Sequence, residues 1–326
     1  MTAAQEKTAL ICGASGQDAA WLAKLLLEKG YRVVGTSRDA AISSFANLVQ
    51  LGIRDRIKIA SSALTDFRSV IRVLLEHEPD EIYNLSGQTS VGLSFDQPAE
   101  ALESIAFGTL NLLEAIRMLK RPARFYNACS SECFGDVLGE PADENTPFRP
   151  RSPYGVAKAA AFWQVSSYRE AYGLYACSGI LFNHESPLRP ERFVTQKVVA
   201  AACRIADGSG ERLKLGDLSI RRDWGWALEY VEAMWRMLQT SEPADYVICT
   251  GETNPLSAFV EEAFAAVGLR ASDHVDQDRS LFRPADLRSS IGSPTKARER
   301  LGWTATLKMR DVVRAMVAAR RNPRPA

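Results

Sequence analysis

The stretch Thr8-Ala-Leu-Ile-Cys12-Gly13-Ala-Ser-Gly16-Gln17-Asp18-Ala19 joins a short apolar run to a glycine turn. Residues 21–27 follow with the apolar spacing of a helix, which ends before Gly30. Glycines allow a tight turn and let the backbone approach a pyrophosphate, while the start of a helix offers unpaired N–H groups and a positive potential. A glycine pattern alone is often only a turn, but between a strand and a helix it indicates a dinucleotide site.

Strands and helices are expected to alternate through the first half of the chain. Strands are expected over residues 31–37, 57–59, 81–85, 124–129 and 175–181, and helices over residues 67–76 and 99–118. This alternation indicates βαβ units, so the predicted fold class is α/β with a Rossmann-type, doubly wound parallel sheet. We expect residues 1–180 to form the cofactor-binding domain.

The regular alternation stops after residue 181. Later elements are expected at residues 194–206 and 259–267 as helices and at residues 213–215 and 246–250 as strands. Arginines and tryptophans cluster in this part, and arginine offers phosphate a planar fork of donors. Residues 181–326 are therefore predicted to form a smaller C-terminal α/β substrate domain, with some strands and helices returning to the first domain.

Arg38 and Asp39 stand at the end of the second expected strand, where the ribose of a bound adenosine should lie. An arginine there suits the 2′-phosphate of NADP, whereas an aspartate suits the free ribose hydroxyls of NAD. We favour Arg38 and NADP, with NAD not excluded, and Asp39 alone could equally be a solvated loop charge.

Tyr154 and Lys158 are predicted to lie on one face of a helix that starts at Ser152 and Pro153, a good N-cap followed by a residue tolerated at the first helical position. The ammonium could then favour the phenolate, whose unperturbed pKa is about 10. Such pairs also occur by chance on solvated helices, so a cofactor site elsewhere is needed to support this interpretation.

Ser130 and Glu132 follow the expected strand over residues 124–129. In a parallel sheet the carboxyl ends of the strands face the ligand crevice, so these two side chains should reach the same place as the tyrosine and the lysine.

The composition is that of an ordinary globular protein, with 326 residues, 46% hydrophobic, 24% charged and a net charge of +1. Such a charge gives no electrostatic case for binding nucleic acid or a membrane. The polar start lacks the pattern of a signal sequence, and the six scattered cysteines are expected to be buried free thiols, with no metal site. A cytoplasmic location is expected.

With Gly-x-x-Gly-x-x-Ala, a serine at a strand end and Tyr-x-x-x-Lys, the chain resembles the extended short-chain dehydrogenase/reductases, and more narrowly the GDP-mannose 4,6-dehydratases. The most specific matching segments are residues 16–18, 151–158, 168–170, 179–187, 222–225 and 282–284. The resemblance implies a GDP-sugar substrate, bound NADP, and a homodimer or homotetramer.

Residue roles carry over position by position. The resemblance implies that Ser130 binds the sugar, Glu132 is the acid/base, Tyr154 is the catalytic phenol, and Lys158 lowers its pKa and holds the nicotinamide ribose. The positions implied to contact the cofactor are Gly13, Gly16, Gln17, Asp18, Arg38, Leu85, Tyr154, Lys158, His184 and Arg189. Those implied to contact the substrate are Thr89, Asn183, Lys197, Arg222, Arg283 and Asp286.

The implied reaction is the dehydration of GDP-mannose to GDP-4-keto-6-deoxymannose. A hydride leaves sugar carbon 4 for NADP⁺ and returns to carbon 6 after water is lost, so there is no net redox change. The chain departs from the family pattern at Asp39, Ala63, Gln196, Asp217 and Arg288, which fall at cofactor, guanine and diphosphate contacts.

Other functions remain open on the residues alone. A reductase acting on GDP-4-keto-6-deoxymannose would consume NADPH, and another nucleotide-sugar dehydratase or epimerase would act on a different sugar. A silent nucleotide sensor on the same scaffold is the least expected, since all four catalytic groups are present.

Overall fold

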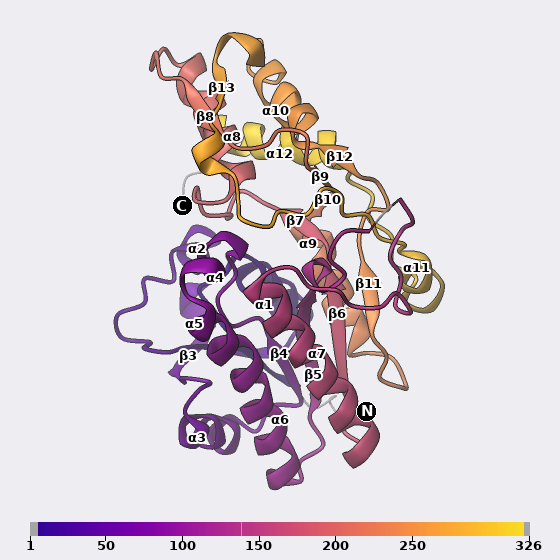
Figure 1. Ribbon diagram of the computed structural model, residues 1–326. Coiled ribbons are helices and arrows are strands. Elements are labelled where there is room, and N and C mark those ends of the chain that lie inside the picture. The colour runs from indigo at the N-terminus through magenta and orange to yellow at the C-terminus, as the bar shows by residue number, and fades with distance from the viewer. Residues whose placement is uncertain (1–5, 138, 323–326) are drawn as a thin grey trace.

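The computed structural model describes residues 6–137 and 139–322, and its centre is a seven-stranded parallel sheet (Figure 1). In spatial order its strands are β11 (Tyr246–Ile248), β6 (Ala176–Leu181), β5 (Arg124–Ser130), β4 (Glu81–Asn84), β1 (Thr8–Cys12), β2 (Arg32–Ser37) and β3 (Lys58–Ser61). The order reverses between β1 and β4, and ligands bind at such switch points, outside the carboxyl ends of the strands. The predicted fold class is confirmed.

Helices cover both faces of the sheet because successive strand residues point to opposite sides. Ala9 and Ile11 pack in one cluster with residues of α1 (Gln17–Glu28), α2 (Ala46–Gln50) and α9 (Ala227–Met237). Leu10 and Cys12 pack in another with α3 (Phe67–His77), α6 (Gly108–Leu119) and α7 (Pro153–Tyr172). Both strand faces are therefore apolar, as a doubly wound sheet requires.

The helix expected over residues 99–118 is divided. It consists of α5 (Pro98–Leu102), a π-helical turn at Glu103–Phe107, and α6. The widened turn lies against the loop after β4: a Cβ on Gly87 would come within 2.8 Å of Ile105 Cγ1, and the Gln88 N–H donates to Ser104 Oγ at 3.1 Å. The π-helical turn therefore packs closely against the loop that follows β4.

A second apolar core lies at the other end of the molecule, at the top of Figure 1. It is built from α8 (Val194–Ala206), β8 (Leu213–Leu215), α10 (Leu256–Ala265) and α12 (Met309–Arg321). The remaining elements are α4 (Val91–Asp96), β7 (Asn183–Glu185), β9 (Arg221–Arg222), β10 (Trp224–Trp226), β12 (Asn254–Pro255), β13 (Val275–Gln277), α11 (Thr295–Leu301) and 3₁₀ turns at 54–56, 131–133, 271–273 and 279–281.

Between these segments the chain returns to the part of the molecule built around the seven-stranded sheet, which we call the first body. There β11 joins the sheet and α9 packs against α1 (Figure 1). The sequence analysis predicts no helix at the positions of α2, α4, α9, α11 and α12. The spacing of Tyr230, Met234 and Met237, all buried, is that of one helix face and could have predicted α9. All six cysteines are buried free thiols, as predicted.

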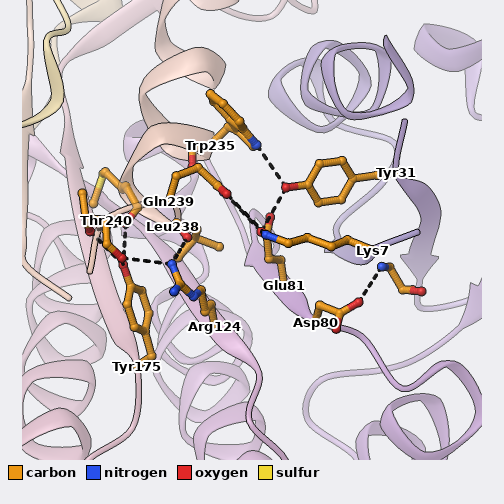
Figure 2. A network of polar contacts seen from close by, with 12 residues as sticks. Lys7, Tyr31, Asp80, Glu81, Arg124, Tyr175, Trp235, Leu238, Gln239 and Thr240 are labelled. Carbon is orange, nitrogen blue, oxygen red and sulfur yellow. Dashed lines mark hydrogen bonds and ion pairs between the residues drawn. The ribbon is translucent and has the colours of Figure 1, made fainter. Parts of the chain in front are cut away.

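Figure 2 shows the contacts that hold the end of α9 to the amino end of the sheet, away from the crevice. The buried carboxylate of Glu81 accepts from Lys7 Nζ at 3.1 Å, Tyr31 Oη at 3.0 Å and Gln239 Nε2 at 3.2 Å. Arg124 donates from Nη1 to the carbonyl of Leu238 at 2.6 Å. The buried Glu81 carboxylate therefore has enough hydrogen-bond donors, and these contacts stabilise the packing of α9 against the amino end of the sheet.

Candidate functional site

The glycine turn between β1 and α1 has the shape that its sequence predicts. Gly13 has φ +87°, and a Cβ there would come within 2.9 Å of the Leu85 carbonyl oxygen. Gly16 is the N-cap of α1, and no side chain caps this helix start. The first amides of α1 are therefore left to bind an external acceptor, which is the arrangement that binds phosphate groups.

Three residues expected to contact the cofactor are joined to one another. Asp18 Oδ2 lies 2.8 Å from His184 Nε2, while Gln17 Nε2 donates to Asp18 Oδ1 at 2.9 Å and to the His184 carbonyl at 3.3 Å. Ser186 Oγ donates to Gln17 Oε1 at 2.8 Å and accepts from Trp21 Nε1 at 3.0 Å. These bonds fasten the start of α1 to the segment around β7.

Arg38 and Asp39 differ in their surroundings. Asp39 Oδ1 accepts the N–H of Ala41 at 2.9 Å, so this carboxylate stabilises its own loop. Arg38 is exposed, and it forms no hydrogen bond or ion pair with any residue that the structure describes. Of the two, Arg38 has the side chain that is available to an anion.

Tyr154 and Lys158 both lie on the buried face of α7. Ser152 is the N-cap of this helix, as predicted, and its hydroxyl accepts from the Gly155 N–H at 3.0 Å. Lys158 Nζ donates to the carbonyl of Ala128 in β5 at 2.6 Å and lies 5.8 Å from the centre of the Tyr154 ring. The pair therefore sits against the carboxyl end of β5.

The pKa of Tyr154 does not move in the direction that the sequence predicted. Burial raises it, although the Ser130 side chain lowers it in part. Burial also lowers the pKa of Lys158. Loss of solvation is the largest effect on both groups because both lie in the interior, and the Lys158 ammonium donates to the Ala128 carbonyl. In the protein alone the phenol stays protonated.

Glu132 lies in the 3₁₀ turn Ser131–Cys133, directly after β5. The Ser130 hydroxyl accepts the Glu132 N–H at 3.3 Å, which directs the chain out of the strand. Burial raises the pKa of the Glu132 carboxyl, Arg222 and Arg283 lower it in part, and two further carboxylates raise it again. The carboxylate is near enough to Tyr154 to contribute to that phenol's raised pKa.

Arg222, Arg283 and Asp286 come together from distant parts of the chain. Arg222 donates to Asp286 Oδ1 and to the Leu287 carbonyl, both at 2.8 Å, and its side chain is buried. Arg283 Nη1 lies 3.5 Å from the same Asp286 oxygen. Since both arginines influence Glu132, they place positive charge beside the catalytic candidates.

The other two cationic candidates lie near α8. Arg189 Nε is 3.4 Å from Glu185 Oε2, and the guanidinium lies 3.8 Å from the centre of the Phe193 ring. Lys197 Nζ donates to the carbonyl of Lys214 at 2.8 Å. In this structure both cations are bound to the protein's own groups.

The two uncharged substrate candidates occupy loop and strand positions. Thr89 is exposed in the loop between β4 and α4. Asn183 is the first residue of β7 and pairs with Trp224 of β10.

Asp136 is a residue of the site that the sequence did not indicate. It accepts from Arg151 Nη1 at 2.6 Å and from the Arg288 N–H at 2.6 Å, and it is one of the carboxylates that raise the pKa of Glu132. It therefore joins the loop after Glu132 to the segment that carries Arg283 and Asp286. Its position four residues after Glu132 is the only signal that could have found it.

No helix in residues 6–137 or 139–322 combines the length and apolar composition needed to cross a membrane. The same residues hold no group of three or more histidine, cysteine, aspartate or glutamate side chains that could bind a metal ion.

The family model described as GDP-mannose 4,6 dehydratase matches residues 10–316. GDP-mannose 4,6 dehydratase 1 of Arabidopsis thaliana is 43% identical over 321 residues, which are 95% of this chain and 89% of the relative. Among solved structures, UDP-glucose 4-epimerase of Thermus thermophilus, in complex with NAD, has a TM-score of 0.85 and 26% identity over 97% of this chain and 99% of that chain. RMD from Pseudomonas aeruginosa, complexed with NADPH, has a TM-score of 0.80 and 24% identity over 96% and 97% of the two chains, a likeness of fold.

Proposed function

Because the chain belongs to the GDP-mannose 4,6-dehydratase family, we propose that it removes water from GDP-mannose and forms GDP-4-keto-6-deoxymannose. The observation that carries this proposal is the half-buried carboxyl of Glu132, whose charge acts on the phenol of Tyr154. Eliminating water needs an acid/base group in addition to the one that serves the oxidised hydroxyl. Glu132 supplies that second group.

The cofactor that we propose is NADP, whose nicotinamide accepts a hydride from the sugar and returns it. The residues fit a dinucleotide: Gly13 leaves room for close approach of the backbone, and α1 begins without a side-chain cap. Arg38, exposed and without an internal partner among the described residues, suits a 2′-phosphate. The bound dinucleotides of the two solved neighbours, NAD in one and NADPH in the other, support a nicotinamide cofactor of either kind.

Each catalytic side chain has a separate task in this proposal. Tyr154 takes the proton of the hydroxyl on carbon 4 as a phenolate, a form that the positive charges of bound NADP⁺ and of Lys158 would favour over the protonated phenol of the protein alone. The Ser130 hydroxyl binds the sugar beside it. The ketone formed at carbon 4 acidifies the proton on carbon 5, which Glu132 removes. Glu132 then protonates the hydroxyl that leaves carbon 6 as water. When the hydride returns to carbon 6, the proton that Tyr154 took up is delivered to carbon 5, so that protons and electrons balance. The raised pKa of Glu132 suits a group that must both accept and donate a proton near neutral pH.

Mass spectrometry tests the proposed reaction. Purified protein with GDP-mannose and NADP⁺ is expected to yield a nucleotide lighter by one water, with no net formation of NADPH. Stoichiometric consumption of NADPH with GDP-4-keto-6-deoxymannose would instead identify a reductase. Nucleotide binding without turnover of any nucleotide sugar would indicate a sensor.

Replacing Arg38 with alanine is expected to weaken NADP⁺ binding roughly ten- to a hundred-fold, because a hydrogen bond to a charged group is lost, and to leave NAD⁺ binding unchanged. Titration calorimetry with each dinucleotide measures the difference. Arg270→Ala is the matched control, since that side chain is 84% exposed and lies outside the site. An equal loss for both dinucleotides, or no loss, would contradict the choice of NADP.

We also propose that the protein works as a homodimer or homotetramer in the cytoplasm. Phe107, next to α6, and Trp163 and Tyr172 of α7 expose large apolar side chains. The π-helical turn that holds Phe107 packs against α7, and exposed apolar groups on neighbouring elements support contact with another chain. The six free thiols agree with a reducing compartment.

A further inference from the structure

The start of α1 carries a carboxylate close to the place where an anion should bind. Asp18 is the second residue of this helix and lies two positions after the N-cap, Gly16. An acidic side chain in the first turn stabilises a helix. The same charge would repel a pyrophosphate that approaches the free amides, unless another group neutralises it.

His184 faces this carboxylate from the segment beyond β6. Its Nδ1 lies 2.7 Å from the carbonyl oxygen of Phe182, and its Nε2 lies 2.8 Å from Asp18 Oδ2. A carbonyl and an ionised carboxylate can only accept hydrogen bonds, so both ring nitrogens must donate. The imidazole is therefore an imidazolium, and the pair is a salt bridge with no net charge.

The surroundings keep this pair together. The His184 ring is buried and stacks on Tyr230 of α9, with centroids 4.5 Å apart and planes at 27°. Burial by itself lowers the pKa of His184, but the Asp18 carboxylate outweighs burial and the pKa is raised. The other charged groups that act on this histidine are Arg189, which lowers its pKa, and Glu185, which lies beside it.

The pKa of Asp18 shifts in the opposite direction to that of His184, as expected for two partners of an ion pair. Burial raises the pKa of its carboxyl, but His184 and Gln17 outweigh burial, so the pKa is lowered and the carboxylate stays ionised. A buried ion pair becomes costly as soon as one partner is removed, because the remaining charge is left without compensation.

We propose that His184 is a positioning residue that neutralises Asp18, so that the start of α1 accepts an anionic pyrophosphate while its first turn stays fastened to the β7 segment. This role rests on the proposed function, which places a dinucleotide at the glycine turn. The contact between Asp18 and His184 thereby links the glycine turn, where the dinucleotide would bind, to the part of the molecule that carries Asn183 and the second core.

The experiment measures the dissociation constant of NADP⁺ by titration calorimetry on nucleotide-free protein, for the wild type, His184→Gln, Asp18→Asn and the double variant. His184→Gln is expected to weaken binding roughly ten- to a hundred-fold, because Asp18 is left charged. Asp18→Asn is expected to lose less affinity than His184→Gln, because His184 can then release its proton and no unpaired charge remains. The double variant is expected to bind NADP⁺ at least about tenfold more tightly than His184→Gln alone, since neither charge remains.

His77→Gln is the matched control, because His77 is buried at the end of α3 and its carbonyl accepts from Arg32 Nη2 at the amino end of the sheet, opposite the glycine turn. Circular dichroism and the unfolding midpoint of each variant show whether it folds. Recovery of affinity in the double variant is the signature of charge compensation, since a purely structural role would make the two losses add.

Two results would overturn the role of His184: binding by His184→Gln as tight as by the wild type, or a double variant that binds as weakly as His184→Gln. If His184→Gln fails to fold, Asp18→Asn and the double variant still decide, because a large loss of affinity in either contradicts compensation. Wild-type protein that binds no dinucleotide would refute the proposed cofactor and, with it, this role.

Discussion

Replacing Glu132 with glutamine is expected to lower the rate of water loss from GDP-mannose by roughly 10²–10⁴-fold, while hydride exchange at carbon 4 continues. The amide keeps the shape of the side chain but cannot remove the proton on carbon 5 or protonate the leaving hydroxyl. The first step uses Tyr154 and is expected to remain. Deuterium transfer between carbon 4 and the cofactor, followed by mass spectrometry, measures that step separately from dehydration.

The pH profile gives this prediction a second signature. The pKa of Glu132 is raised by burial, so the base form is lost as the pH falls through that raised value. In the wild type kcat/KM should fall on this acidic limb, and the limb should be absent in the residual activity of Glu132→Gln. Glu140→Gln is the control, because Glu140 is exposed in the loop that follows. Equal dehydration by Glu132→Gln and the wild type would refute the assigned role.

Replacing Tyr154 with phenylalanine is expected to lower both hydride exchange and dehydration, each by roughly 10²–10⁴-fold. Both depend on removing the proton of the hydroxyl on carbon 4, and no other side chain is assigned to that proton. The contrast with Glu132→Gln, which loses only the later step, assigns the two groups to different stages. The same deuterium assay measures both variants.

Tyr172→Phe is the matched control for this change, since Tyr172 lies on the same helix and is 53% exposed. It should keep full activity. Unimpaired exchange at carbon 4 in Tyr154→Phe would contradict the role of the phenol. A biological role that survives this substitution unchanged would favour the nucleotide sensor.

Local sequence patterns determined the fold class and most of the first body. The apolar run before Gly13 and the helical spacing after Gly16 specify a strand, a turn and a helix within one continuous stretch. Ser152 marks the start of α7 in the same way, because an N-cap acts on an amide three residues later. These features depend on neighbours in the chain, so the sequence alone predicts them.

The path of the second half was less predictable. Strand β11 joins the sheet beside β6, and α9 packs on α1, although long stretches of chain separate these elements from their partners. Short apolar segments such as Tyr246–Ile248 suggest a strand but do not say which sheet it joins. That choice is made by the buried surfaces available once the first body has formed.

The electrostatics of the site were decided by tertiary structure. The sequence placed Lys158 beside Tyr154 and predicted a lowered pKa for the phenol, but burial raises it. The pairing of Asp18 with His184, and of Asp136 with Arg151 and the Arg288 amide, joins parts of the chain that no local pattern relates. A residue's type and spacing are written in the sequence, whereas its solvation and its charged neighbours exist only in the folded molecule, and these set its pKa.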